Sequence, residues 1–294
     1  MTGGISLQIG PSTFEWGTQT YLMGIVNVTP DSFSGDGLLS TDNRWVERAV
    51  EQGIQQEKQG AHIIDVGGES TRPGSTPVSL EEELARVIPV IRALSVHVRI
   101  PISVDTYKSE VAKAALSAGA SIINDVWGFH MDSGMADVAR ETGATVILMH
   151  NRSKPKDSSQ ETRLGGRYVG VVYENLIEDI KRELLESIAI AHAVGVARDK
   201  IIVEPGIGFG KTVEQNIELV NRFRELKDLG YPILAGPSRK SFVGYTLDLP
   251  PADRLEGTAA AVTLLTERGA DIIRVHDVQA MSRVVSLTKA IVRS

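Results

Sequence analysis

Residues 122–149 read IINDVWGFHMDSGMADVARETGATVILM, and this stretch decides the fold class. Its first and last segments, Ile122–Asp125 and Thr145–Met149, are short apolar runs that predict strands buried on both faces. Between them the apolar spacing predicts a helix over Met135–Thr142, capped by the Asp-Ser pair at 132–133. A strand, a helix and a second strand in this order connect parallel strands of one sheet.

The same unit recurs along the rest of the chain. Six further apolar, β-branched runs predict strands, and each gap is long enough for a crossover helix. These runs are Leu22–Val28, Ile63–Val66, Ile100–Val104, Ile201–Glu204, Ile233–Gly236 and Ile272–Val275. Eight such units favour an α/β fold in which the parallel sheet closes into a (β/α)8 TIM barrel. The length of 294 residues suits one such barrel, so we predict a single domain over residues 1–294.

Smaller signals lie between and before these strands. The segment Ile5–Trp16, within an N-terminal extension of about residues 1–18, predicts a β-hairpin that plugs the N-terminal end of the barrel. Ser79, followed three residues later by Glu82, matches a capping box ahead of a helix. The longest helix is expected from about Val171 to Val194, where Gly195 would end it.

Three connections are too long to be simple turns. Residues 29–40 and 67–78 are rich in Gly, Pro, Ser and Thr, which is typical of active-site loops that close over a ligand. Residues 151–166 are polar and of mixed charge, and we expect them to be the most flexible part of the chain.

Composition excludes several classes of function. The chain has no cysteine, which rules out disulfides, thiolate metal sites and a cysteine nucleophile and agrees with a reducing cytoplasm. The formal net charge of -6 provides no basic footprint for nucleic acid. There is no run of about 18 apolar residues and no signal-peptide pattern, so we expect neither membrane insertion nor secretion.

Polar residues gather where the predicted strands stop. In a (β/α)8 barrel all eight carboxyl ends of the strands lie on one rim, so residues far apart in sequence meet at one mouth. The strand ends carry Asn27, Asp65, Asp105, Asn124, Asp125, His150, Glu204, Ser238–Lys240, Arg274 and His276. We therefore predict one binding site at this end of the barrel.

One set of these residues suits an anionic ligand. Arg72, Lys240, Arg274 and His276 are positive or neutral donors, and the glycine-rich segment Pro205–Gly210 adds backbone amides. Guanidinium groups and backbone N–H groups of this kind bind phosphate well.

A second set suits a flat heterocycle. Asp105, Asn124 and Glu204 supply acceptors and one amide, which match the amino-pyrimidine edge of such a ring, and Lys240 can serve either ligand. Apolar contacts to flat rings can come from Phe33, Pro73, Met149 and Phe209.

Each residue has an ordinary explanation when it is taken alone. A single Asp or Asn at a strand end is usually a helix cap or a turn former, and Met149 is more often a core residue. Arg274 and His276 can belong to a surface salt bridge, and the segment Pro205–Lys211 lacks the Walker phosphate-binding pattern. The conjunction of such residues at eight separate strand ends favours a functional site.

Seven motifs, in order, resemble those of the dihydropteroate synthases. They are Asn27-Val-Thr-Pro-Asp-Ser-Phe-Ser34, Asp65-Val-Gly-Gly-Glu-Ser-Thr-Arg-Pro-Gly74, Ser103-Val-Asp-Thr106, Ile122-Ile-Asn-Asp-Val126, Pro205-Gly-Ile-Gly-Phe-Gly-Lys211, Ser238-Arg-Lys-Ser241 and Arg274-Val-His-Asp277. The resemblance runs from Tyr21 to the C-terminus. It implies a TIM-barrel homodimer and a transferase of folate biosynthesis that sulfonamides block. The implied reaction condenses 6-hydroxymethyl-7,8-dihydropterin diphosphate with p-aminobenzoate to give 7,8-dihydropteroate and pyrophosphate, with Mg²⁺ as cofactor.

The resemblance also assigns roles to residues of this chain. Pterin would be bound by Asp105, Asn124, Met149, Glu204, Phe209, Gly236 and Lys240. Diphosphate would be bound by Asn27, Thr71, Arg72, Arg274 and His276, with Asn27 also at the Mg²⁺ ion. p-Aminobenzoate would be bound by Phe33, Pro73, Lys240 and Ser241. The residues expected to carry catalysis are Arg274, His276, Lys240 and Asp105.

Two positions depart from the family pattern, and two rival functions stay open. Glu204 stands where the family usually has Asp, so we expect pterin affinity to differ, whereas Pro237 in place of Thr or a small aliphatic residue is expected to have little chemical effect. One rival is a methyltransferase-type barrel that binds methyltetrahydrofolate, but it would not need the anion donors at Arg72, Lys240 or Arg274. The other is a catalytically inactive pterin-binding scaffold, which the complete set of donors disfavours.

Overall fold

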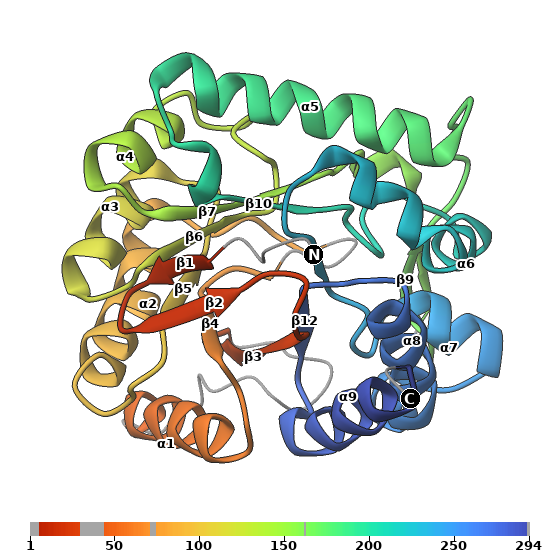
Figure 1. Cartoon of the computed structure of the whole chain (residues 1–294), viewed down its shortest axis with the longest axis horizontal. Coiled ribbons are helices and arrows are strands. Elements are labelled where there is room, and N and C mark those ends of the chain that lie inside the picture. The colour runs from red at the N-terminus through yellow and green to blue at the C-terminus, as the bar shows by residue number, and fades with distance from the viewer. Residues whose placement is uncertain (1–5, 30–43, 71–74, 162, 293–294) are drawn as a thin grey trace.

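A computed structural model describes residues 6–29, 44–70, 75–161 and 163–292. Eight parallel strands form one sheet in the order β10-β7-β6-β5-β4-β3-β12-β11 (Figure 1). They are β3 (Tyr21–Asn27), β4 (Ile63–Gly67), β5 (Ile102–Asp105), β6 (Ile122–Asp125), β7 (Thr145–Met149), β10 (Ile201–Glu204), β11 (Leu234–Ala235) and β12 (Ile272–Val275). The two ends of the sheet meet because Val203 of β10 bridges Ile233 in parallel. The predicted barrel is therefore confirmed.

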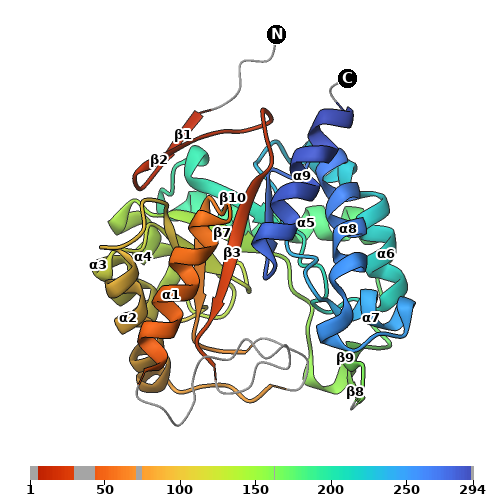
Figure 2. The same ribbon diagram turned by 90° about the horizontal axis from the view of Figure 1, so that it is seen from below.

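Helices between successive strands form a ring outside the sheet (Figures 1 and 2). They are α1 (Trp45–Lys58), α2 (Leu80–Leu94), α3 (Ser109–Ala118), α4 (Met135–Thr142), α5 (Leu176–Val194), α6 (Val213–Asn221), α7 (Ser241–Leu247), α8 (Leu255–Glu267) and α9 (Val278–Val292). Short 3-10 segments lie at Pro155–Asp157, Arg198–Lys200, Phe223–Leu229 and Pro251–Asp253. No helix in the described part of the chain has the length and apolar run that a membrane crossing needs.

Apolar side chains are buried in two main layers. The larger layer lies between the sheet and the helices, and Val66, Val104 and Ile123 are among its fully buried members. The smaller layer is built from strand residues such as Met23, Ile147 and the N-terminal hairpin. Because successive strand residues point to opposite faces, apolar runs with no polar alternation supply both layers at once.

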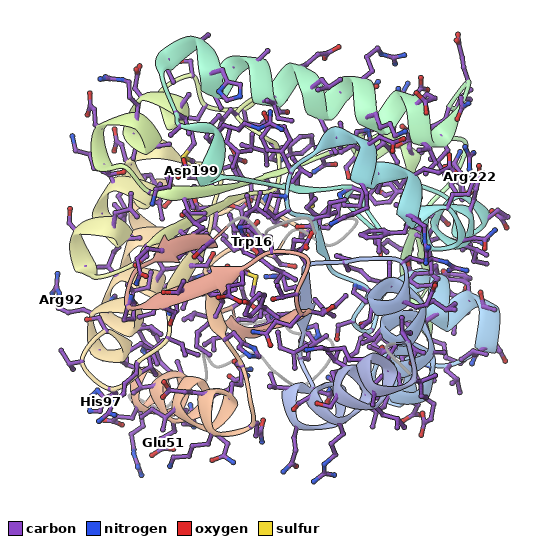
Figure 3. The ribbon with its side chains drawn as sticks, in the orientation of Figure 1. Trp16, Glu51, Arg92, His97, Asp199 and Arg222 are labelled. Carbon is purple, nitrogen blue, oxygen red and sulfur yellow. The ribbon has the colours of Figure 1, made fainter. Side chains whose placement is uncertain are left out.

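The predicted N-terminal hairpin is confirmed. Strands β1 (Ser6–Ile9) and β2 (Ser12–Glu15) pair in antiparallel fashion and cover the end of the barrel from which β3 starts (Figure 2). Phe14 is 1% exposed and stacks with Trp16 at a ring-centroid distance of 5.4 Å. Figure 3 shows Trp16 in the middle of this end, whereas Glu51 and Arg92 point outward at the edge. The hairpin closes the barrel bottom, so the opposite end is left for ligands.

Several element boundaries differ from the predictions. Strand β11 has two residues, because Pro232 and Pro237 flank it and proline cannot donate to a strand ladder. Helix α5 ends before Gly195 as predicted but begins at Leu176, where the Asn175 side chain accepts a hydrogen bond from the Glu178 N–H.

Two predicted helix caps were also partly wrong. At α4 the cap residue is Gly134, and Asp132 instead accepts hydrogen bonds from the Gly134 and Ser109 N–H groups. At α2 the Ser79 side chain does accept from the Glu82 N–H, but the Glu82 carboxylate pairs with Arg86, so only half of the capping box forms. In both places a tertiary or side-chain partner competed for the expected group.

The segment 151–166 contains ordered structure that its composition did not predict. Strand β8 (Ser158–Glu161) pairs with β9 (Gly165–Tyr168) in an antiparallel hairpin near the carboxyl end of the barrel (Figure 2). Arg254, which is 3% exposed, donates to the Leu164 carbonyl oxygen at 2.7 Å, and the Tyr245 hydroxyl donates to the Gly165 carbonyl oxygen. Tertiary hydrogen bonds therefore hold a segment whose sequence has no strong local preference. Most of the expected active-site loop 29–40, and the tip of the loop 67–78, lie outside the described residues.

Candidate active site

A pocket lies at the carboxyl ends of the barrel strands, where the sequence predicted a site. It is lined by every described residue to which a binding role was assigned: Asn27, Asp105, Asn124, Met149, Glu204, Phe209, Gly236, Lys240, Ser241, Arg274 and His276. Three other residues expected at the strand ends, Asp65, Asp125 and His150, are not among the lining residues. The predicted residues Phe33, Thr71, Arg72 and Pro73 lie outside the described residues. The barrel topology thus brings together side chains separated by up to 249 positions, from Asn27 to His276.

Arg274 joins the two chemical sets that the sequence suggested. Its Nη2 donates to Asp105 Oδ2 at 2.8 Å and its Nε donates to Asp65 Oδ2 at 2.6 Å. The Asp65 side chain is fully buried, and Asn124 Nδ2 also donates to it at 3.2 Å. The two sets are in contact at this point, because β3 is the neighbour of β12 in the sheet and β4, which carries Asp65, is the strand after β3.

Two carboxyl groups of the pocket resist ionisation. Burial raises the pKa of Asp105 to about 8, and Arg274 opposes this increase. Burial also raises the pKa of Glu204 to about 7, again against the effect of Arg274. Both groups are close to buried Asp65, whose charge adds to the increase in each pKa. The pocket is thus an acidic site in which a cationic ligand would favour the ionised forms.

The Glu204 carboxylate fits into the pocket because its neighbour at position 236 is a glycine. Gly236 of the β11 connection leaves space there, since a Cβ atom at this position would lie 3.2 Å from Glu204 Oε1. Asn124 also lines the pocket, and its Oδ1 has no hydrogen-bond partner among the described residues. Asn124 can therefore accept a hydrogen bond from a ligand.

A flat wall borders these polar groups. Phe209 packs with Met149 and Val126 in a small buried cluster, and Lys240 Nζ lies 4.1 Å from the centre of the Phe209 ring. An aromatic face beside a cation suits stacking of a planar ligand. Met149 is 2% exposed, so it is both a core residue and part of the pocket lining.

His276 is oriented by a neighbouring strand end. Its Nδ1 lies 2.9 Å from Ser238 Oγ, and its own backbone N–H donates to the same oxygen at 3.2 Å. Next to this pair, Arg239 forms an ion pair with Asp277 at 2.7 Å. These contacts hold together the segments that follow β11 and β12.

Several residues of the site were missing from the assigned roles. Asp65 and Ser238 stand at predicted strand ends, so their position was a usable signal, but their partners depend on the closed barrel. Glu69, Gln160 and Leu164 also line the pocket. Leu164 comes from the β8–β9 hairpin, which no pattern in the sequence placed there.

The pocket offers few protein ligands for Mg²⁺. Among the described residues no cluster of three or more His, Cys, Asp or Glu side chains has the geometry of a metal site. Mg²⁺, however, commonly binds through one or two protein oxygens together with water and substrate phosphates. Asn27, whose side chain carries an amide oxygen, lines the pocket, and so does Thr29, two residues further along the chain. These donors fit an ion that the substrate phosphates help to bind.

Comparison with known proteins places the chain in a family. The family model described as "Pterin binding enzyme" matches residues 23–276. The dihydropteroate synthase of Clostridium beijerinckii is 46% identical over 288 residues, which cover 98% of this chain and 100% of that protein.

Solved structures agree with this match. The structure of dihydropteroate synthase from Clostridium difficile, obtained in the presence of pteroic acid, is 46% identical with a TM-score of 0.86, and the match covers 96% of this chain and 100% of that one. The Yersinia pestis dihydropteroate synthase in complex with a sulfonamide drug is 36% identical with a TM-score of 0.89, covering 99% and 100%. The chain therefore belongs to the pterin-binding enzymes with a TIM-barrel fold. Within that class it is a member of the dihydropteroate synthases, transferases of folate biosynthesis.

Proposed function

We propose that this chain condenses 6-hydroxymethyl-7,8-dihydropterin diphosphate with p-aminobenzoate by ionisation of the pterin-CH2–O bond, followed by attack of the amine. The observation that carries the proposal is the meeting of Asp105, Asn124 and Glu204 with Lys240, Arg274 and His276 in one pocket. Acceptors for a heterocycle and donors for a phosphorylated group are then within reach of a single bound molecule.

The acidic residues would bind the pterin and stabilise its cationic form. Loss of the diphosphate from the methylene carbon leaves positive charge on an electron-rich ring. Glu204 is buried and the Asp105 side chain is only 11% exposed, so both groups interact more strongly with charge than they would in water. In their ionised forms these carboxylates are held in place beside the ring, so they would stabilise the developing cation more than the neutral ground state.

The donors would stabilise the departing pyrophosphate. Arg274 is held in place by Asp65 and Asp105, and His276 by Ser238, so neither needs to reorganise when negative charge develops. Mg²⁺, when bound near Asn27 and the phosphates, would supply further neutralisation of the leaving group. The amine of p-aminobenzoate is neutral at neutral pH and attacks without a strong general base. Lys240 and Ser241, which border the pocket, would contact this second substrate, with Phe33 and Pro73 added from the loops.

We also propose that the chain acts as a homodimer in the cytoplasm. Support for a subunit contact comes from apolar side chains on the neighbouring helices α8 and α9: Leu264 is 43% exposed, Leu287 63% and Ile291 65%. Light scattering should give twice the mass of the chain, and Leu287→Asp should reduce it to that of a monomer. The absence of cysteine agrees with a reducing compartment.

The direct test is to incubate the purified protein with pterin diphosphate, p-aminobenzoate and Mg²⁺. We expect dihydropteroate and pyrophosphate in equal amounts, and omission of p-aminobenzoate should prevent dihydropteroate formation. Failure to release pyrophosphate would favour the inactive pterin-binding scaffold. Methyl transfer from methyltetrahydrofolate without pyrophosphate release would favour the methyltransferase-type barrel.

A further inference from the structure

Lys211 is a buried lysine that the reaction does not use, and burial lowers the pKa of its amine well below the ordinary value. It is 2% exposed and does not line the pocket. Its Nζ donates to the carbonyl oxygens of Gly206 at 3.0 Å and Phe209 at 3.1 Å, and lies 2.9 Å from His150 Nδ1. A buried lysine is costly unless its donors are satisfied, and here three acceptors surround the amine.

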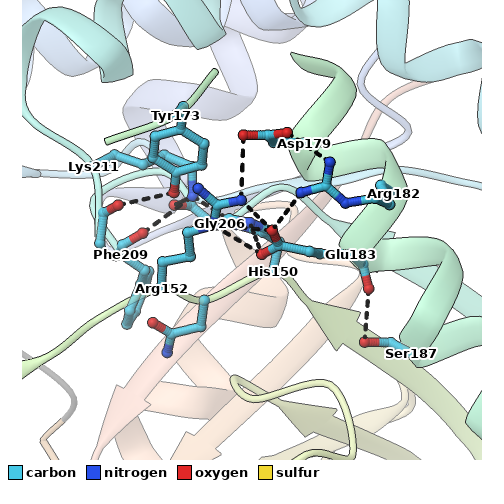
Figure 4. Close-up of polar contacts among 12 residues, drawn as sticks. His150, Arg152, Tyr173, Asp179, Arg182, Glu183, Ser187, Gly206, Phe209 and Lys211 are labelled. Atoms are coloured by element: carbon cyan, nitrogen blue, oxygen red, sulfur yellow. Dashed lines mark hydrogen bonds and ion pairs between the residues drawn. The ribbon is translucent and has the colours of Figure 1, made fainter. Parts of the chain in front are cut away.

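Lys211 is linked through His150 to the carboxylate of Glu183. The opposite nitrogen of that ring, Nε2, lies 3.0 Å from Glu183 Oε2, and Arg152 Nε donates to the same carboxylate at 3.0 Å (Figure 4). A neutral imidazole that accepts from Lys211 at Nδ1 must carry its proton at Nε2, which then donates to Glu183. Burial lowers the pKa of His150 to about 4, and the Lys211 charge acts in the same direction, in agreement with a neutral ring.

The loop that Lys211 closes has little conformational freedom. Gly206 and Gly210 have positive φ angles of 68° and 56°, and a Cβ atom would lie 2.0 Å from the His150 carbonyl oxygen at the first and 2.3 Å from Arg152 at the second. The loop is therefore pressed against the segment that follows β7. Lys211 stands at the end of this loop. Its hydrogen bonds to the carbonyl oxygens of Gly206 and Phe209 tie the end of the loop back to its earlier residues.

This loop forms the aromatic wall of the pocket. Phe209, whose carbonyl oxygen Lys211 holds, is the residue whose ring lies against Lys240. Gly208 also approaches Lys240 closely, since a Cβ atom there would lie 2.9 Å from Lys240 Cδ. A change in the backbone at Phe209 would therefore move the ring and the lysine that are expected to bind pterin.

We propose that Lys211 is a positioning residue for pterin. By holding the Phe209 carbonyl oxygen it fixes the position of the Phe209 ring, and His150 and Glu183 in turn hold Lys211 in place. The proposal deepens the pterin site proposed above and presupposes it. A lysine that only stabilised the fold would affect every ligand of the pocket equally. Loss of a positioning lysine would lower the affinity for pterin, which is expected to stack on Phe209. It would leave unchanged the affinity for pyrophosphate, which Arg274 and His276 are expected to bind.

The test compares two probes on Lys211→Met, which keeps the side-chain length and removes the donors. At a temperature well below the unfolding midpoint, calorimetry should show that affinity for 6-hydroxymethylpterin falls about tenfold or more. Affinity for pyrophosphate with Mg²⁺ should change less than about twofold. Equal losses for both probes, or unchanged pterin affinity in the folded variant, would overturn the proposal. If the unsubstituted protein binds neither probe, the proposed function has failed and not the role of Lys211.

Two further variants make the result specific. In a Phe209→Ala background, Lys211→Met should cause little additional loss of pterin affinity, because both changes act on the same wall; additive losses would contradict the proposal. The matched control is Lys200→Met, which removes a lysine that contacts the Gln8 carbonyl oxygen at the opposite end of the barrel and should leave both affinities unchanged. If Lys211→Met does not fold, Glu183→Gln should weaken pterin binding in the same selective way, and an equal loss for pyrophosphate would count against it.

Discussion

Arg274 Nη2 lies 2.8 Å from Asp105 Oδ2, so a residue assigned to the diphosphate is bonded to a residue assigned to the pterin. Their Cα atoms belong to strands β12 and β5, which are separated in the sheet by β3 and β4. The bond therefore crosses the mouth of the barrel. A change at either end should alter the electrostatics of both substrates' sites.

Arg274→Ala should lower kcat by about 100-fold or more, because it removes a preorganised donor from the leaving group. It should also destabilise the protein by about 3–5 kcal/mol, since the fully buried Asp65 is left without its cation and Asp105 loses a hydrogen-bond donor. Turnover measured below the unfolding temperature, together with denaturant unfolding, separates the two effects.

The matched control is Arg224→Ala, which removes a surface ion pair with Glu267 and should change stability by less than about 1 kcal/mol. Near-normal turnover of folded Arg274→Ala would contradict the role assigned to this residue.

Glu204→Gln should stabilise the protein more at about pH 8.5 than at about pH 5.5. Burial raises the pKa of Glu204 to about 7 in the native state, above the ordinary value of a carboxyl group. The native state therefore binds this proton more tightly than the unfolded chain, and stability is lost as the pH rises toward and through 7. Gln cannot ionise, so the advantage of the variant should grow by up to about 2 kcal/mol across this range.

Urea unfolding of both proteins at the two pH values measures this difference. Glu141→Gln, which alters an exposed carboxylate, serves as the control. A difference that stays constant with pH would show that Glu204 ionises as readily in the native state as in the unfolded chain.

Glu204→Asp should preserve or tighten pterin binding. The Glu204 carboxylate fills space beside Gly236, and shortening it by one methylene keeps the charge while giving the heterocycle more room. Calorimetry with 6-hydroxymethylpterin checks this expectation. A large loss of affinity would mean that the pocket is adapted to the longer side chain.

Removal of Mg²⁺ with EDTA should weaken binding of pterin diphosphate far more than binding of a pterin without phosphates. The described protein donors near Asn27 are too few to hold such an ion alone, so we expect that substrate phosphates would be needed for it to bind. Titration of both ligands with and without the chelator tests this expectation. An equal loss for the two ligands would argue against an ion that bridges Asn27 and the substrate.

Phe14→Ala should destabilise the protein by about 3–5 kcal/mol without changing kcat below the unfolding temperature. Phe14 is 1% exposed, and its ring lies 5.4 Å from Trp16 and 4.7 Å from Tyr21 at the end of the barrel opposite the pocket. Thr13→Ala, on the exposed side of the same strand, is the control. A fall in kcat of folded Phe14→Ala would show that the plug and the pocket are coupled.

The sequence by itself determined the barrel and the location of the site. The strand Thr145–Met149 and the end of helix α5 before Gly195 depend on residues that are close together in the chain. Local sequence patterns can therefore predict them. The rule that parallel strands share a carboxyl end then placed Asn124, Glu204 and Arg274 at one mouth.

Only the tertiary structure decided which of these groups touch. The bonds of Arg274 to Asp65 and Asp105 join residues 209 and 169 positions apart, and they exist because barrel closure sets the neighbours across the mouth. Likewise, Lys211 looks like an ordinary charged residue in the sequence, and the burial that surrounds its amine with acceptors comes from packing against the segment after β7. Local periodicity carries no information about such pairings, because their energies depend on distances that the chain acquires only when the barrel closes.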